Sequence, residues 1–284
     1  MAARITWTLC ASTKRTMHTI APAIFAEITQ CLSDIEREHS VRVLYACESG
    51  SRAWGFESQD SDYDVRFIYA RPRDWYLAID VERKRDVIEV PISDDLDIAG
   101  WDIRKTLQLF YKSNPPLNEW LVSPIIYMQQ GEFANRLRHL APASYNPIAA
   151  HYHYLRMAGN NFRSYLKGDI VRRKKYLYVL RPLLALNWIE KGDGVVPIEF
   201  DKLVSETVAD PNLLREIDEL LDLKRAGMES DEGPRFKIIH SFIESEMERH
   251  GDDHKQQPGS RADMSTLNDL FRTTIEADAP RNGT

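Results

Sequence analysis

Hydrophobic residues recur with two different periods along the first hundred residues, and these periods predict a helix followed by strands. Between residues 21 and 39 the apolar side chains lie three or four positions apart, as on one face of a helix: Ile24, Phe25, Ile28, Leu32 and Ile35. Shorter runs rich in β-branched and aromatic residues then predict strands over residues 41–47, 64–69, 86–92 and 96–100. This order is typical of a sheet that carries helices.

The period becomes helical after Ile103, and strand signals nearly vanish after residue 117. The helix that begins at Ile103 is expected to end in the proline-containing stretch over residues 112–116. Longer amphipathic helices are predicted further along the chain, over residues 146–167, 172–191, 212–228 and 234–249. From Gly251 the chain is polar and contains proline and glycine, which predicts a disordered tail.

These patterns divide the chain into two folded parts and a tail. A length of 284 residues is enough for two modest domains. We expect the first domain over residues 20–130, an all-helical domain over residues 145–250 and the tail over residues 251–284. The boundary would fall between residues 130 and 145. The predicted fold class is α+β, with a mixed sheet and its helices followed by the helical domain.

Composition and charge exclude some classes of protein. The hydrophobic fraction of 43% supports a real core, and the net charge of −6 disfavours non-specific binding along nucleic acid. No apolar run is long enough to cross a membrane, and the first residues lack the apolar core of a secretory signal. The three cysteines have no metal-ligand spacing, which predicts reduced thiols. We therefore expect a cytoplasmic protein with no membrane partner.

The segment between the first two predicted strands carries residues suited to phosphate and metal chemistry. Gly50 and Ser51 form a turn into a short helix, where backbone N–H groups and the Ser51 hydroxyl would bind phosphates. Asp62 and Asp64 lie two positions apart on a strand, so both carboxylates leave the same face. Either pair alone would also fit a solvated turn. Together they predict a site for a nucleoside triphosphate and its metal ions.

A third carboxylate is expected from a neighbouring strand, because the hard cation Mg²⁺ prefers oxygen ligands. Asp97, inside the predicted strand over residues 96–100, is the first choice. Asp102 is the rival, although its place before Ile103 also suits an N-cap. We therefore assign catalytic and metal-binding roles to Asp62, Asp64 and Asp97, with Asp102 as the alternative to the last.

One face of the helix predicted over residues 172–191 is polar. Lys174, Tyr178 and Arg181 lie four and three positions apart, so they share this face. If the face is turned toward the metal site, the three side chains would contact the triphosphate or the base of a nucleotide. A face that is simply exposed to solvent is the alternative.

The glycine-serine turn, the following helix and the Asp62-Tyr63-Asp64 strand resemble the DNA polymerase β nucleotidyltransferase superfamily. Further segments resemble the RNA repair pathway polymerase-β-like family of predicted nucleotidyltransferases. They are residues 50–55 (GSRAWG), 61–69 (SDYDVRFIY), 100–105 (GWDIRK), 113–116 (SNPP), 119–121 (EWL), 174–178 (KKYLY) and 180–183 (LRPL). This resemblance spans about residues 40 to 200.

The resemblance implies a mixed sheet with helices on one side, a site that depends on Mg²⁺ or Mn²⁺, and an NTP substrate, for which we expect ATP. It implies that Gly50 and Ser51 hold phosphates and that Asp62 and Asp64 bind metal. The acceptor would be a hydroxyl group, with an RNA 3′ end suggested by the family name and a protein or small-molecule hydroxyl left open. A non-catalytic nucleotide sensor is the alternative of a different class.

Overall fold

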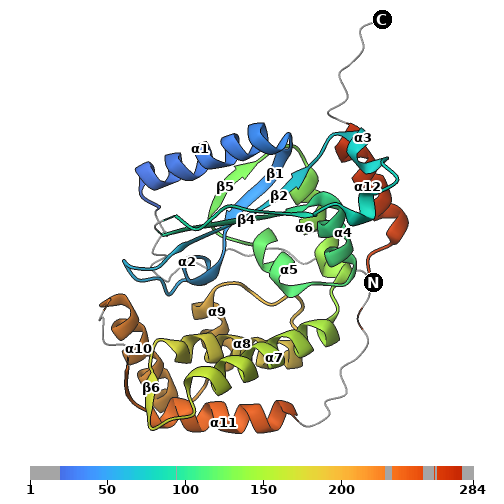
Figure 1. The fold of residues 1–284 in the computed structure, drawn as a ribbon. Coiled ribbons are helices and arrows are strands. Elements are labelled where there is room, and N and C mark those ends of the chain that lie inside the picture. The colour runs from blue at the N-terminus through green and yellow to red at the C-terminus, as the bar shows by residue number, and fades with distance from the viewer. Residues whose placement is uncertain (1–19, 94, 228–231, 252–258, 260, 277–284) are drawn as a thin grey trace, which may run out of the picture.

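The computed structural model of the protein describes residues 20–93, 95–227, 232–251, 259 and 261–276. Figure 1 shows two parts stacked on each other, with the sheet and its helices above and a group of helices below. The predicted α+β class, a sheet-bearing part followed by a helical part, is confirmed. Within the ranges given above, no helix combines the length and apolar character needed to cross a membrane.

The first part contains one mixed sheet of five strands. Their bounds are β1 Arg42–Glu48, β2 Tyr63–Ala70, β3 Val87–Glu89, β4 Leu96–Asp102 and β5 Ile126–Gln129. The order across the sheet is β3-β4-β2-β1-β5; β2 and β4 run parallel, whereas the other neighbours run antiparallel. The sequence predicted the first four strands. It missed β5, whose four residues are too few to establish a period.

Helices cover both faces of the sheet, so the expectation of helices on one side is wrong. On one face α1 (Pro22–His39) buries Ile28, Leu32 and Ile35 against side chains of β1 and β2. The other face is covered by α4 (Ile103–Tyr111), α5 (Pro115–Leu121) and α6 (Phe133–Ser144). Strand β1 is accordingly buried along almost its whole length rather than at alternate residues. Two short elements, α3 (Arg73–Tyr76) and a 3₁₀ turn (Val81–Arg83), lie between β2 and β3.

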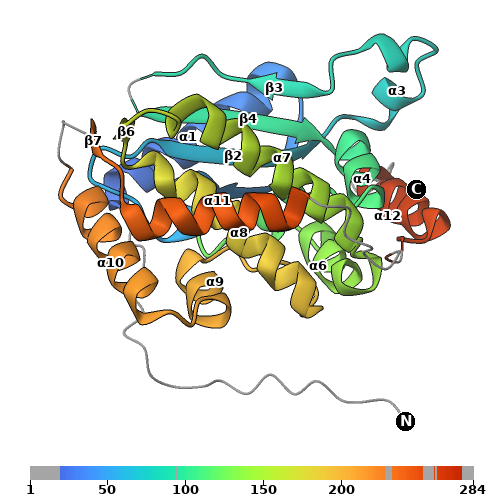
Figure 2. The ribbon, with the colours of Figure 1, turned by 90° about the horizontal axis from the view of Figure 1, so that it is seen from below.

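Helix α8 (Lys175–Lys191) is the centre of the second part. Most of its side chains are buried, and it packs on α7 (Pro147–Tyr165), α9 (Phe200–Thr207) and α11 (Lys237–Gly251), as Figure 2 shows. Helix α10 (Pro211–Arg225) packs on α11, and the strands β6 (Ile170–Arg172) and β7 (Glu232–Pro234) form a short pair. The four long predicted helices correspond to α7, α8, α10 and α11. Helix α9 and the β6–β7 pair were not predicted.

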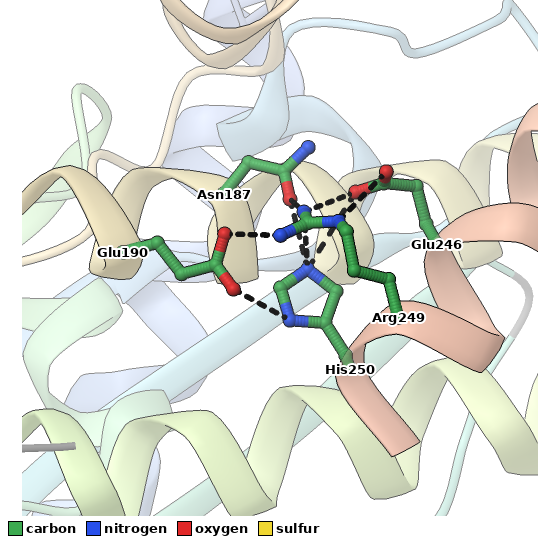
Figure 3. A network of polar contacts seen from close by, with 5 residues as sticks. All are labelled: Asn187, Glu190, Glu246, Arg249 and His250. Carbon is green, nitrogen blue, oxygen red and sulfur yellow. Dashed lines mark hydrogen bonds and ion pairs between the residues drawn. The ribbon is translucent and has the colours of Figure 1, made fainter. Parts of the chain in front are cut away.

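A polar network joins the last turn of α11 to α8 (Figure 3). Arg249 donates hydrogen bonds to Asn187 at 2.5 Å, to Glu190 at 2.5 Å and to Glu246 at 2.6 Å. The buried His250 ring lies 3.3 Å from Glu190 and 3.5 Å from Glu246. Burial alone would raise the pKa of Glu246, but hydrogen bonds from His250 and Arg249 lower this pKa to about 2. The network therefore holds an ionised Glu246 between the two helices.

Helix α12 (Met264–Glu276) corrects the prediction for the end of the chain. It packs on α4 of the first part, with Leu267 and Leu270 buried between them. The Arg42 guanidinium also donates a hydrogen bond to the Thr274 carbonyl at 2.9 Å. The predicted disorder is therefore wrong for α12, because its few apolar residues share one helical face despite the polar surroundings. Residues 252–258, 260 and 277–284 lie outside the described residues.

Candidate active site

The turn between β1 and α2 (Gly50–Trp54) brings the main chain against the Asp64 carboxylate. Gly50 has a φ of +60°, and a Cβ atom there would lie 2.0 Å from Asp64 Oδ2. The Ser49 N–H also donates to the Asp64 carbonyl at 2.8 Å, which ties the turn to β2. Only glycine combines this backbone conformation with so close an approach. The space beside the Gly50 Cα is thus filled by Asp64, and Ser51 follows it as a buried residue of α2.

The parallel pairing of β2 and β4 places Asp64 directly opposite Asp97. Residues paired in this way direct their side chains to the same face of the sheet. The Arg66 guanidinium lies between the two carboxylates, with Nη2 at 3.2 Å from Asp64 Oδ1 and 2.7 Å from Asp97 Oδ2. A second nitrogen of Arg66 donates to the Asp97 carbonyl at 2.9 Å. The structure therefore brings Asp97 and Asp64 together through Arg66.

Asp62 precedes β2 and is exposed, two residues before Asp64. Its carbonyl accepts a hydrogen bond from Arg52 Nε at 3.1 Å, and the Arg52 guanidinium lies 3.9 Å from the centre of the Tyr63 ring. Burial raises the pKa of Asp64; Arg66 opposes this rise, and the charges of Asp97 and Asp62 add to it. The negative charges of Asp97 and Asp62 therefore both act on the partly buried Asp64 carboxyl.

Asp102, the rival for the third carboxylate, lies at the other end of β4. Its Oδ1 accepts a hydrogen bond from the Arg104 N–H at 2.8 Å, which makes it the N-cap of α4. Its Oδ2 accepts from the Tyr76 hydroxyl at 2.8 Å. Burial raises the pKa of this carboxyl to about 6. Both oxygens are therefore used in the fold, and Asp97 is the acid that lies beside Asp64.

Glu48, at the end of β1, received no role from the sequence but lies directly behind the site. It is fully buried, and its Oε1 accepts a hydrogen bond from the Asp64 N–H at 2.9 Å. Its Oε2 accepts from the Tyr127 hydroxyl at 2.5 Å. Burial raises the pKa of Glu48 to about 7, although both hydrogen bonds oppose the rise. A carboxylate at the end of an otherwise apolar strand was the signal that could have identified this residue.

The donors present fit a Mg²⁺ ion that shares its coordination shell with water and phosphate. In the part of the chain that the structure describes, no three His, Cys, Asp or Glu side chains converge to hold a metal by themselves. Mg²⁺ is usually held by one or two carboxylates, and waters and substrate phosphates complete the shell. Asp62 and Asp64 are the carboxylates that would hold such an ion, and its charge would offset the negative charge around Asp64.

The polar face of α8 is turned toward the first part of the chain rather than toward solvent. Lys174, which precedes the helix, lies 3.6 Å from the exposed Asp60 carboxylate. The Tyr178 ring packs edge-on against Trp54 of α2 and against Phe56, with ring centres 5.9 and 6.0 Å apart. The first two members of the predicted set therefore lie beside the segment that connects α2 to β2.

Arg181, the third member, is buried between the two parts, with only 1% of its surface exposed. Its guanidinium is 3.0 Å from Glu119 of α5, donates to the Ile198 carbonyl and stacks on Trp54. Glu119 also accepts hydrogen bonds from the Tyr154 hydroxyl and from the Trp54 indole. The buried guanidinium therefore has no exposed surface with which to contact a nucleotide. Its role here is to join α8 to α2 and α5.

Two known proteins are similar to this chain. The chain is 51% identical over 246 residues to the uncharacterized protein YcgL of Bacillus subtilis (strain 168). The aligned region covers 86% of this chain and 94% of that protein. A crystal structure of a nucleotidyltransferase-like protein from Exiguobacterium sibiricum 255-15 is 12% identical. The alignment covers 89% of this chain and 81% of that one, with a TM-score of 0.31.

The family comparison covers nearly the whole of the described chain. The profile of the RNA repair pathway DNA polymerase beta family matches residues 24–273, from α1 in the first part to α12 at the end of the chain. The match includes Gly50, Asp62, Asp64 and Asp97, and it also includes the complete helical part. The chain belongs to the RNA repair pathway DNA polymerase beta family.

Proposed function

We propose that this protein is a metal-dependent nucleotidyltransferase that moves a nucleoside monophosphate from an NTP, with ATP as the expected substrate, to an acceptor hydroxyl. Membership of the family supports nucleotidyltransferase chemistry. One observation carries the proposal: the β2–β4 register sets Asp97 beside Asp64, with Asp62 two residues away and Gly50 against the Asp64 carboxylate.

In the proposed reaction the acceptor oxygen forms a bond to the α-phosphorus, and the bond from that phosphorus to pyrophosphate breaks. Bound Mg²⁺ or Mn²⁺ ions would supply the positive charge that stabilises the oxygens involved. Asp62 and Asp64 would hold these ions, and Asp97 orients the acceptor hydroxyl and accepts its proton. The N–H groups of Gly50 and Ser51 bind the phosphates, and Lys174 and Tyr178 contact the nucleotide from the helical part. The protein contributes mainly positioning and charge neutralisation.

An RNA 3′ end is the acceptor that we favour, because the family is described as part of an RNA repair pathway. A net charge of −6 suits contact with a short end better than with a long stretch of phosphates. The test is to incubate the protein with each labelled NTP, Mg²⁺ or Mn²⁺, and either total RNA or total protein. Label in the RNA fraction supports this acceptor, and label in the protein fraction replaces it by a protein hydroxyl.

The Asp62→Asn/Asp64→Asn double variant tests the site itself. We expect it to lose pyrophosphate release while its circular dichroism spectrum stays that of the native protein. Asp201→Asn, which changes an exposed aspartate of α9, is the matched control and should keep full activity. A double variant that still releases pyrophosphate at the native rate would rule out this site.

Arg66 supports a second candidate function, a nucleotide sensor without turnover. Its guanidinium already lies between Asp64 and Asp97, so the two carboxylates have a cation partner within the protein itself. A sensor would bind NTP and release no pyrophosphate with any acceptor. Equilibrium binding of ATP measured beside pyrophosphate release separates the two functions.

A further inference from the structure

The segment that joins α2 to β2 ends in Asp62, and the helical part holds this segment. Phe56, near its start, is fully buried in the core of the helical part rather than in that of the sheet. Two residues later the chain makes a compact turn: the Ser61 N–H donates to the Ser58 carbonyl at 3.1 Å, and the Ser58 N–H donates to Ser61 Oγ at 2.9 Å. Both serines are buried, although Asp60 between them and Asp62 after them are exposed.

Lys224, on α10, reaches this turn from the other part of the molecule. Its ammonium group lies 3.3 Å from Ser58 Oγ and 3.4 Å from Ser61 Oγ, and only 7% of the residue is exposed. In Figure 1, α10 lies below α2 at the left of the view. A lysine ammonium has three donors and no acceptor, so one group can bond both hydroxyls at once. Lys224 therefore connects two residues of the turn to a helix more than 160 positions away.

Arg52 holds the same turn from the side of the sheet. Its guanidinium donates to the Ser61 carbonyl at 2.6 Å and to the Asp62 carbonyl at 3.1 Å. The turn thus has a cation on each side, one from α2 and one from α10. The Asp62 side chain itself makes no hydrogen bond or ion pair with the described residues, whereas Asp64 belongs to β2, pairs with Asp97 of β4 and contacts Arg66. The position of the Asp62 carboxylate relative to Asp64 therefore depends on how this turn is held.

We propose that Lys224 is a positioning residue for the metal site: through Ser58 and Ser61 it makes the helical part set the backbone from which Asp62 extends. This inference rests on the proposed function, because it assumes that Asp62 and Asp64 share a cation. Loss of Lys224 removes the ammonium group that bonds both serine hydroxyls, while Arg52 and Lys174 still contact the segment, and it widens the range of distances between the two carboxylates. Residues that orient metal ligands from behind change metal affinity by about 10–100-fold when they are substituted.

Lys224→Met removes the ammonium and keeps most of the side-chain length. We expect the dissociation constant of Mn²⁺, measured by electron paramagnetic resonance with a non-hydrolysable ATP analogue present, to rise about tenfold. Ser61→Ala removes a hydroxyl that accepts hydrogen bonds from both Lys224 and the Ser58 N–H. This substitution should also raise the dissociation constant of Mn²⁺. The double variant should bind Mn²⁺ only slightly more weakly than either single variant, because each substitution breaks the same connection between Lys224 and the turn. Lys237→Met, at an exposed position of α11, is the control and should bind Mn²⁺ like the wild type.

A different result is expected if Lys224 only stabilises the fold and does not position Asp62. In that case Lys224→Met changes the melting temperature in EDTA, and the Mn²⁺ affinity of the folded protein stays at the wild-type value; this outcome overturns the proposal. If Lys224→Met yields no folded protein, the Mn²⁺ affinity of Ser61→Ala decides in its place. Wild-type protein that binds neither Mn²⁺ nor the analogue contradicts the proposed function instead, so the two failures are distinguishable.

Discussion

Glu48→Gln is expected to stabilise the protein, and by more as the pH rises. The Glu48 side chain is fully buried and accepts hydrogen bonds from the Asp64 N–H and from the Tyr127 hydroxyl. Glutamine has the same shape, so its carbonyl oxygen can accept from Asp64 and its amide group can donate to Tyr127. The substitution therefore keeps the packing and removes one negative charge behind the proposed metal site.

The size of the effect follows from the pKa of Glu48, which burial raises from 4.5 to about 7. A carboxyl with a raised folded-state pKa binds its proton more tightly in the folded protein. Its contribution to stability is therefore complete below about pH 4.5 and is lost as the pH rises through about 7. A pKa difference of one unit corresponds to about 1.4 kcal/mol. The free energy of unfolding of the variant should therefore exceed that of the wild type by about 3 kcal/mol at pH 8 and by about 1 kcal/mol at pH 5.

Urea unfolding followed by circular dichroism, at several pH values and with EDTA present, measures this difference. EDTA matters because a bound cation would hide the charge at the site. Glu219→Gln removes an exposed carboxylate of α10 and serves as the control, with no pH-dependent gain expected. The reasoning is refuted if the advantage of Glu48→Gln is the same at pH 5 and pH 8, since a burial-raised pKa demands a difference.

Three further substitutions test other parts of the structure. Gly50→Ala places a Cβ 2.0 Å from Asp64 Oδ2 at a residue with a left-handed backbone, so NTP-dependent pyrophosphate release should be lost. Gly194→Ala is the control: Gly194 also has a positive φ, but no atom of the described residues beyond its chain neighbours lies within 4 Å of the added Cβ, and pyrophosphate release should stay intact. Glu119→Ala leaves the guanidinium of Arg181 buried without its carboxylate, and urea unfolding should show a loss of about 3–5 kcal/mol. Leu270→Ala should lower the free energy of unfolding by about 2–5 kcal/mol if α12 is part of the core, and no change would contradict its packing on α4.

Elements whose own sequence carries a long period could be predicted, and elements that depend on distant partners could not. Helix α1 repeats its apolar face over 18 residues, and the strands β1 and β2 carry continuous apolar runs. Strand β5 has four residues, and β6 and β7 have three each, so their pairing depends on the strands they meet. Helix α12 has a single apolar face in a polar stretch. Its packing on α4 distinguishes it from a solvated tail, and that partner lies some 160 residues earlier.

The same distinction applies to the site. Asp62 and Asp64 were predicted together because both lie on one short segment, although β2 begins at Tyr63 and only Asp64 is a residue of the strand. The choice of Asp97 over Asp102 follows from the β2–β4 register, which pairs Asp64 with a residue 33 positions away. Glu48 and Arg66 act through contacts between neighbouring strands, and no spacing along the chain reveals those contacts.

The sequence left two roles open for the polar face of α8, contact with a nucleotide and exposure to solvent, and the structure adds another. Lys174 and Tyr178 contact the segment that leads to Asp62, and Arg181 is buried against Glu119 and Trp54. Phe56 completes the arrangement, because it leaves the sheet-bearing part and is buried in the helical core. A helix face with a cation, an aromatic ring and a buried arginine at helical spacing therefore also forms an interface between two parts of one chain, beside the nucleotide contacts proposed for Lys174 and Tyr178. Since that interface holds α2 and the turn before β2, the helical part acts on the proposed metal site through the backbone that carries the acids.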